Sequence, residues 1–183
     1  MTIKLSDRDT FYEKMYFHEI TERDRLDDRF RTLLAIVAIV FAMIGYLFNA
    51  IVLGSENVPL LFWAIYGIAA ISFTAAIVCY IKAWHSQHYY AFPRLGDIED
   101  YVVQIRHHYQ DHFQDESDKH HIEQYADKAF KQFMRQSFID HASYNSRAND
   151  SKRFWMYYGN SFIVNAFVFC VMAFIPVSNL LVQ

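Results

Sequence analysis

The sequence predicts an all-α membrane protein with three transmembrane helices and a cytoplasmic helical segment. Three stretches of the 183-residue chain carry no charged residue, and each is long enough to cross a bilayer. The chain is 54% hydrophobic and 18% aromatic, whereas only 20% of its residues are charged. Soluble domains are usually less apolar. A soluble all-α bundle, the alternative, would not be expected to contain three uncharged stretches of this length.

A cytoplasmic amphipathic helix is predicted within residues 1–31. Ser6 or Asp7 can cap this helix, and no Gly or Pro interrupts it before the first uncharged stretch. Its loose apolar face consists of Phe11, Met15, Ile20, Leu26 and Phe30. The dense charge of this segment argues against an N-terminal signal peptide.

Residues 32–83 are predicted to form a transmembrane hairpin. Residues 33–53 carry no charge over 21 positions, and residues 58–81 carry none over 24. A helix needs roughly 20 apolar residues to cross a hydrocarbon core of about 30 Å. A short polar turn at residues 54–57 joins the two spans. Pro59 lies in the first turn of the second span, where its missing N–H does no harm.

Residues 84–153 are predicted to form a cytoplasmic helical domain. Pro93 and Gly96 break the helix after the hairpin, and Asp97 is expected to cap a new one. Apolar side chains at three- and four-residue spacing give the new helix one buried face: Ile98, Tyr101, Val102, Ile105, Tyr109 and Phe113. A turn is expected at residues 114–117. A second long helix without Gly or Pro then covers residues 118–158 and runs into the third span.

The third transmembrane helix is predicted over residues 154–181, because residues 154–183 carry no charge over 30 positions. The spans contain few polar side chains, and the most polar are Asn49, Asn160, Ser161 and Asn165. In lipid such groups face helix partners or water, so these four are candidates for helix contact or pore lining. The spans contain no acid, base or histidine, which argues against a proton pump or an ion-coupled transporter.

The orientation follows from the cationic residues. All 17 Lys and Arg residues lie in residues 4–31 or 82–153. Several lie directly beside span ends, where the positive-inside rule is strongest: Arg29, Arg31, Lys82, Lys152 and Arg153. The N-terminus and residues 82–153 are therefore predicted to lie in the cytoplasm, and the hairpin turn and the C-terminus outside.

Composition and spacing argue against several classes of site. The net charge of −3 gives no basic excess, so direct DNA binding is not expected. Cys79 and Cys170 lie in apolar runs and are expected to be reduced packing thiols. His108 and His112 have the i,i+4 spacing of metal ligands. The sequence fixes no third ligand, so neither a metal site nor a cofactor is predicted.

Two Arg/His pairs match the loose Arg-x(4–6)-His pattern of HEPN ribonucleases: Arg106 with His112, and Arg135 with His141. In such a site the arginine would bind phosphate and the histidine would act in acid–base cleavage of RNA. Nine histidines in 183 residues produce matches to so loose a pattern by chance. No catalytic residue is therefore assigned, and the chain is not expected to be an enzyme.

A polar cluster precedes the third span and contains Asn145, Asn149, Asp150, Lys152 and Arg153. Asn145 and Asn149 lie four residues apart and therefore share one helical face. The cluster is a candidate ligand or switch site, or a lock against the N-terminal helix. A simple polar membrane junction is the alternative.

Short sequence motifs lie beside the predicted spans. Tyr12-Glu13-Lys14-Met15-Tyr16-Phe17-His18-Glu19-Ile20 and then Arg25-Leu26-Asp27-Asp28-Arg29-Phe30 lead into the hairpin, and Tyr89-Tyr90-Ala91-Phe92-Pro93 follows it. Asn149-Asp150-Ser151-Lys152 precedes a last span that ends in Phe174-Ile175-Pro176. This layout resembles small SLATT-like bacterial membrane proteins, often assigned to antiviral defence. It also resembles the membrane accessory protein of Cas13b (type VI-B) CRISPR systems, which carries a divergent HEPN-like motif. The third span departs from the simplest two-span SLATT-like layout.

The resemblance implies a homo-oligomer in the bacterial inner membrane whose spans ring a pore or depolarise the bilayer. Its partners would be membrane lipids, further copies of the chain, and a cytosolic defence complex or nucleotide messenger that acts on the cytoplasmic helices. Two other hypotheses remain open. One is a membrane-anchored HEPN-like ribonuclease, and the other is a non-catalytic membrane anchor or assembly subunit.

Overall fold

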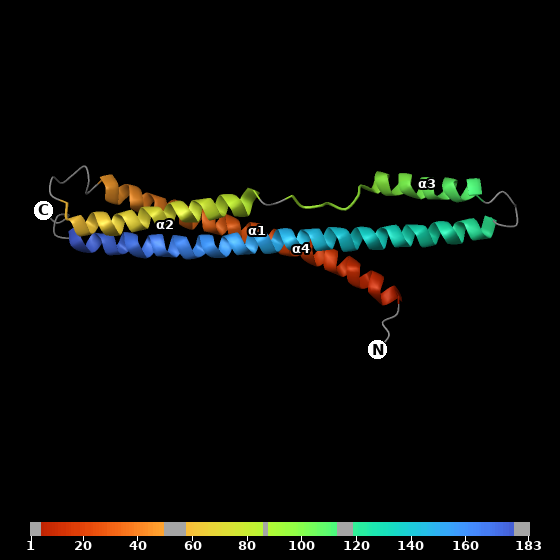
Figure 1. Ribbon diagram of the computed structural model, residues 1–183, viewed down its shortest axis with the longest axis horizontal. Coiled ribbons are helices and arrows are strands. Elements are labelled where there is room, and N and C mark those ends of the chain that lie inside the picture. Colours follow the sequence, from red (N-terminus) through yellow and green to blue (C-terminus); the bar gives the residue numbers. More distant parts are fainter. Residues whose placement is uncertain (1–4, 50–57, 86–87, 113–118, 178–183) are drawn as a thin grey trace. The chain divides into compact units, whose positions relative to one another are not determined.

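The computed structural model describes residues 5–49, 58–85, 88–112 and 119–177. This part of the chain is all-helical and contains no strand, as predicted. Its elements are α1 (Leu5–Leu47), α2 (Leu60–His85), α3 (Leu95–His112), α4 (Lys119–Phe174) and the 3-10 turn η3 (Ile175–Val177) (Figure 1). Three segments are long and apolar enough to cross a membrane: Asp9–Leu47, Leu60–His85 and Ile122–Phe174.

The chain divides into two compact units. Unit 1 comprises residues 1–22 and 88–147, and unit 2 comprises residues 23–87 and 148–183. α1 and α4 contribute to both units, because in each of them a charged stretch and an apolar stretch form one helix. The predicted continuation of both charged helical segments into apolar stretches is therefore confirmed. The turns predicted at 54–57 and 114–117 lie outside the described residues.

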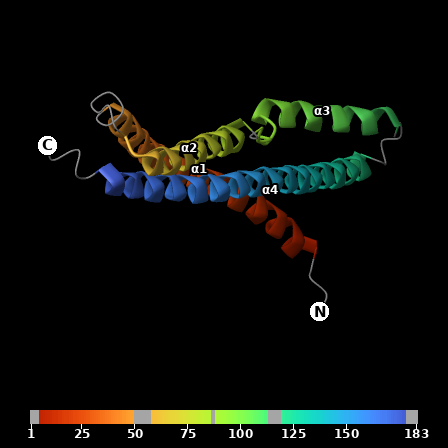
Figure 2. The ribbon, with the colours of Figure 1, turned by 60° about the vertical axis from the view of Figure 1, so that its left-hand side comes forward.

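Small side chains that recur every seven residues build the core of unit 2. Fully buried at this spacing are Ala69, Ala76 and Ala83 of α2 and Ala166 and Ala173 of α4. Gly159 continues the α4 series, and a Cβ placed on it would lie 2.7 Å from Cε1 of Tyr80. Small residues let helix backbones approach closely. α2 and the C-terminal part of α4 accordingly run side by side in both views (Figures 1 and 2).

Larger apolar side chains from α1 complete this core. Leu26, Phe30 and Val40 pack with Tyr80 and Met156 in one cluster. Leu47 packs with Phe62 and Cys170 in a second cluster. Cys79 and Cys170 are both free thiols and both buried.

Aromatic contacts hold unit 1 together. α3 packs on α4 through Tyr101 and Phe133, whose ring centroids lie 4.1 Å apart. Nearer the α3–α4 connection, the rings of Tyr109 and Tyr125 stack at 5.8 Å. The N-terminal part of α1 joins them through Tyr16, whose ring lies 5.8 Å from that of Phe138.

The start of α3 corrects one prediction. α3 begins at Leu95, so Asp97 lies inside the first turn and not before it. The Asp97 carboxylate accepts a hydrogen bond from the backbone N–H of Arg94 at 3.2 Å. The N–H of Ile98 donates to the carbonyl of Arg94 at 3.1 Å. Arg94 is therefore the N-cap, and Asp97 reaches back to it as the acidic third residue of a capping box does.

Candidate functional site

The four polar residues predicted to contact helices or line a pore fall into two groups. Asn160 and Ser161 have hydrogen bonds within unit 2. The Tyr80 hydroxyl donates to Oδ1 of Asn160 at 2.9 Å, and the Ser161 hydroxyl donates to the backbone carbonyl of Tyr157 at 3.1 Å. The Ser161 hydroxyl is therefore paired within its own helix, whereas Asn160 keeps its Nδ2 group as a donor.

Asn165 and Asn49 form the second group, because their side chains point outward. Asn49, which follows α1, is exposed, and so is Asn165 on α4. Within the described residues, the Asn165 side chain forms no hydrogen bond. An amide without a partner costs several kcal/mol in lipid. In an apolar environment, the Asn165 amide would therefore require a hydrogen-bond partner beyond the described residues.

The surroundings of Asn165 form a regular exposed surface. Its members recur at alternating steps of four and three residues, and we call them the α4 stripe: Phe154, Tyr158, Ser161, Asn165, Val168 and Met172, all exposed. The buried face of α4 shows the same period in Met156, Gly159, Ile163, Ala166, Cys170 and Ala173. An a/d repeat of this kind is the pattern of helices that pack along their length. α4 thus carries one such face that is covered in unit 2 and one that is not.

A buried ion pair joins α1 to α4 at the edge of the apolar core. The Lys152 side chain has 0% exposure, and its ammonium group pairs with the Asp27 carboxylate. Its Nζ also lies 5.9 Å from the centroid of the Phe30 ring. Asn149, one turn earlier on α4, is 1% exposed. Lysine is almost never fully buried unless it is paired, so this contact fixes α1 against α4.

The other members of the predicted polar cluster have different places. Asp150 and Arg153 form an exposed pair, with 3.3 Å between Oδ1 and Nη1. In unit 1, the buried side-chain amide of Asn145 forms two hydrogen bonds with the backbone of Tyr90. Its Nδ2 donates to the Tyr90 carbonyl at 3.2 Å, and its Oδ1 accepts from the Tyr90 N–H at 3.0 Å. Asn145 thereby fixes the non-helical link before α3 to α4.

A lock between this cluster and the N-terminal helix was one of the interpretations of the sequence, but the sequence did not indicate Asp27 as the partner of Lys152. The partners lie 125 residues apart, so no local spacing relates them. The one available signal was a lysine preceding an uncharged run at a position where the a/d repeat of α4 already applies.

The HEPN-like candidates in unit 1 have separate partners. Nε of Arg135 lies 3.8 Å from the Asp9 carboxylate, and its guanidinium group lies 5.4 Å from the Tyr12 ring. The His141 ring packs against Tyr16 and Phe92, and its Nδ1 is buried without a hydrogen-bond partner. The two residues are six positions apart, about 9 Å along the helix axis.

Arg106 lies 3.4 Å from Glu123, and the side chain of its proposed partner His112 lies outside the described residues. The ribonuclease hypothesis therefore stays a prediction. Among the described residues, no group of three or more His, Cys, Asp or Glu side chains is placed to hold a metal ion.

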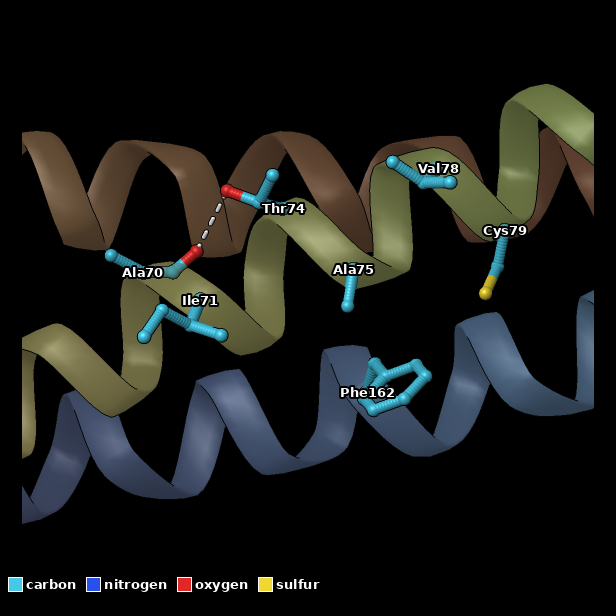
Figure 3. Close-up of a pocket in the computed structure, with 7 residues that line it drawn as sticks. All are labelled: Ala70, Ile71, Thr74, Ala75, Val78, Cys79 and Phe162. Atoms are coloured by element: carbon cyan, nitrogen blue, oxygen red, sulfur yellow. Dashed lines mark hydrogen bonds between the residues drawn. The ribbon is translucent and has the colours of Figure 1, made fainter.

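An apolar groove of about 560 Å³ lies between α2 and α4. Figure 3 shows Phe162 reaching from α4 toward α2, with Cys79 and Ala75 of α2 pointing back toward it. The hydroxyl of Thr74 is the polar side-chain group of the lining, and it donates to the carbonyl of Ala70 at 2.9 Å. The groove therefore accepts apolar groups, such as an acyl chain, and has no free polar group to recognise anything else.

No family model, no curated protein and no solved structure matches the chain.

Proposed function

We propose that the chain is a homo-oligomeric, multi-pass protein of the bacterial inner membrane. In this proposal α1, α2 and α4 cross the bilayer, with the N-terminus in the cytoplasm and the C-terminus outside. Only 22%, 17% and 28% of their most apolar segments is buried within the chain. The remaining apolar surface favours lipid as its surroundings. The confinement of Lys and Arg to residues 4–31 and 82–153 supports the orientation.

The oligomer is proposed to act as a membrane effector that forms a pore or depolarises the membrane. The observation that carries this proposal is the exposed Asn165 amide at the centre of the α4 stripe. Asn165 lies 12 residues past Arg153, about 18 Å along the helix axis. This depth is near the middle of a core of about 30 Å. Copies that meet along the α4 stripe would bring their Asn165 amides together, as hydrogen-bonded glue or as a polar ring.

The cytoplasmic helices are proposed to receive the trigger. Both α1 and α4 pass without a break from unit 1 into apolar segments, so a displacement in unit 1 has two continuous helices through which to reach the spans. The resemblance to defence-associated membrane proteins favours an activated protein complex or a nucleotide messenger as the trigger, and antiphage defence as the setting.

The test combines oligomeric state with membrane potential. The purified full-length chain should be an oligomer in nanodiscs, and its activated form should dissipate the potential of vesicles or cells. Asn165→Leu should abolish both properties, and Asn165→Gln should retain them. Val164→Leu is the matched control, because Val164 is 59% exposed and lies outside the α4 stripe.

A monomeric wild-type protein, or full activity in Asn165→Leu, would refute the proposal. A monomer that binds a cytosolic complex through residues 98–147 would instead favour the anchor hypothesis. RNA cleavage that is lost in Arg135→Ala and His141→Ala would favour the ribonuclease.

A further inference from the structure

A second groove in unit 2 differs from the apolar one in its chemistry. It measures about 490 Å³ and lies between α1 and α4. Arg29 and Leu33 line it from α1, and Arg153, Met156, Tyr157 and Asn160 line it from α4. Two guanidinium groups therefore border a groove whose other walls are largely apolar.

The local charges leave this groove cationic. Arg29 is exposed, and it forms no ion pair with another described residue. The nearby carboxylates have other partners. Asp27 pairs with the buried Lys152, and Asp28 lies 3.9 Å from Arg31. Arg153 keeps its exposed contact with Asp150 at 3.3 Å. Exposed ion pairs of this kind are weak, so Arg153 remains able to bind a second anion.

Polarity changes along the groove in a definite order. Arg29 and Arg153 lie close to the start of uncharged stretches, and the apolar Leu26 lies about one turn before Arg29. Leu33 and Met156 lie about one turn deeper. Asn160 lies seven residues past Arg153, about 10 Å along the axis. Its Oδ1 accepts from Tyr80, which leaves its Nδ2 as a donor. Cation, apolar wall and amide donor follow the order of phosphate, glycerol backbone and ester carbonyl in a phospholipid.

We propose that this groove binds an anionic phospholipid of the cytoplasmic leaflet. Arg29 and Arg153 bind the phosphate group, since guanidinium forks match phosphate oxygens. Leu33 and Met156 contact the glycerol backbone, and the deeper Asn160 amide donates to an ester carbonyl. Basic pockets between transmembrane helices on the cytoplasmic side are suited to anionic headgroups. The inference rests on the membrane insertion and orientation in the proposed function.

Native mass spectrometry of the full-length protein, released from nanodiscs that hold equal amounts of phosphatidylglycerol and phosphatidylcholine, tests this site. Wild-type protein should retain phosphatidylglycerol preferentially. Each of Arg29→Gln and Arg153→Gln should reduce that preference by about fivefold, the effect expected of one interfacial cation. Arg29→Lys with Arg153→Lys should keep most of it. Arg31→Gln is the matched control, because Arg31 is 82% exposed, pairs with Asp28 and does not line the groove.

Equal retention of the two lipids by wild-type protein, or an equal loss in Arg31→Gln, would overturn the inference. Displacement of the lipid by millimolar inorganic phosphate would also overturn it, since the site would then be a free-phosphate site. The same spectra report the oligomer. An intact oligomer without lipid preference refutes this site alone. A monomer that retains the preference refutes the proposed oligomeric effector alone.

Discussion

At the scale of single residues, unit 2 depends on one lysine that has no contact with solvent. Lys152 is 0% exposed, whereas its partner Asp27 is 31% exposed. A buried charge is tolerated only while its partner remains, and removal of one partner leaves an uncompensated charge. Removing Asp27 and removing Lys152 are therefore expected to affect stability differently. Loss of Asp27 removes the ion-pair partner of a buried ammonium group, whereas loss of Lys152 leaves a carboxylate that water can reach.

We expect Asp27→Asn to lower the stability of the purified protein by about 2 kcal/mol, less than the 3–5 kcal/mol of a fully buried pair because Asp27 is partly hydrated. Lys152→Met should cost less than Asp27→Asn. Thermal unfolding in one detergent measures both changes. Asp28→Asn is the control, because Asp28 and its partner Arg31 are 80% and 82% exposed. Equal effects of Asp27→Asn and Asp28→Asn would show that the buried pair is not stabilising.

The close approach of α2 and α4 makes a second residue-scale prediction. In Gly159→Ala the new Cβ would lie 2.7 Å from Cε1 and 3.0 Å from Cδ1 of Tyr80. Tyr80 is itself buried and hydrogen-bonded to Asn160. The substitution should therefore destabilise by about 1–3 kcal/mol, as overpacked cores do.

Gly67→Ala provides the comparison, because a Cβ there meets nothing within 4 Å. It should be neutral or stabilising by about 0.5–1 kcal/mol, since Ala is the better helix former. Thermal aggregation of both variants in the same detergent decides between them. If Gly159→Ala were as stable as Gly67→Ala, α2 and α4 would be able to move apart without a loss of stability.

At the scale of whole elements, α4 carries two heptad faces, and only one of them is covered in unit 2. The long helices themselves were predictable from uncharged runs and apolar spacing, but their ends were not: Gly96, predicted to break the helix, lies inside α3, and α4 ends at Phe174 and not near residue 181. The start of α3 was missed because the cap is formed by a side chain that reaches back from Asp97 to Arg94. The seven-residue spacing of small residues on α2 and α4 is also visible in the sequence, although the predicted helix contacts were based on polar residues in the apolar runs.

The candidate site could be predicted only in part. Asn165 was predicted to contact another helix or line a pore; the structure shows its side chain exposed, and that role stays a prediction. Asn160 and Ser161 were grouped with it, although Asn160 contacts Tyr80 80 residues away. Lys152 was likewise paired across 125 residues. Contacts at such separations depend on how helices assemble, and one sequence without structural information does not specify them.

The uncovered face of α4 predicts a pattern of cross-linking between copies. Single cysteines at Ser161, Asn165 and Val168 should form intermolecular disulfides in native membranes upon oxidation. Cysteines at Val164 and Phe167, which are 59% and 45% exposed but lie off the α4 stripe, should form few. Both native cysteines are buried, so oxidation of the wild-type chain measures the background level of cross-linking. Equal cross-linking on and off the stripe would contradict an interface along it.

At the scale of the whole molecule, the distribution of charge and the three apolar helices lead to one topology. Each charged side chain placed at mid-bilayer costs about 2.5–3.5 kcal/mol on insertion scales. The 17 cationic residues all lie outside the three uncharged stretches. An odd number of crossings would then place the two termini in different compartments.

We expect a reporter that is active only in the cytoplasm to be active at the N-terminus and inactive at the C-terminus. A reporter inserted after Ser117 should be active, and one inserted after Ser55 should be inactive. Placing both termini in the same compartment would rule out three crossings. The full-length chain purified as a detergent-free monomer would rule out membrane insertion altogether.

The link between α2 and α3 has a consequence for how large a stimulus must be. Its backbone N–H groups at Tyr90 and Phe92 donate to the side chains of Asn145 and Tyr16, so a segment without helical bonds is still tied to two helices. Freeing Tyr90 from Asn145 breaks two hydrogen bonds at once, a net cost of about 1–3 kcal/mol. Under the proposed function, an activator of modest affinity would meet that threshold, whereas thermal fluctuation would open the link only in a minority of molecules.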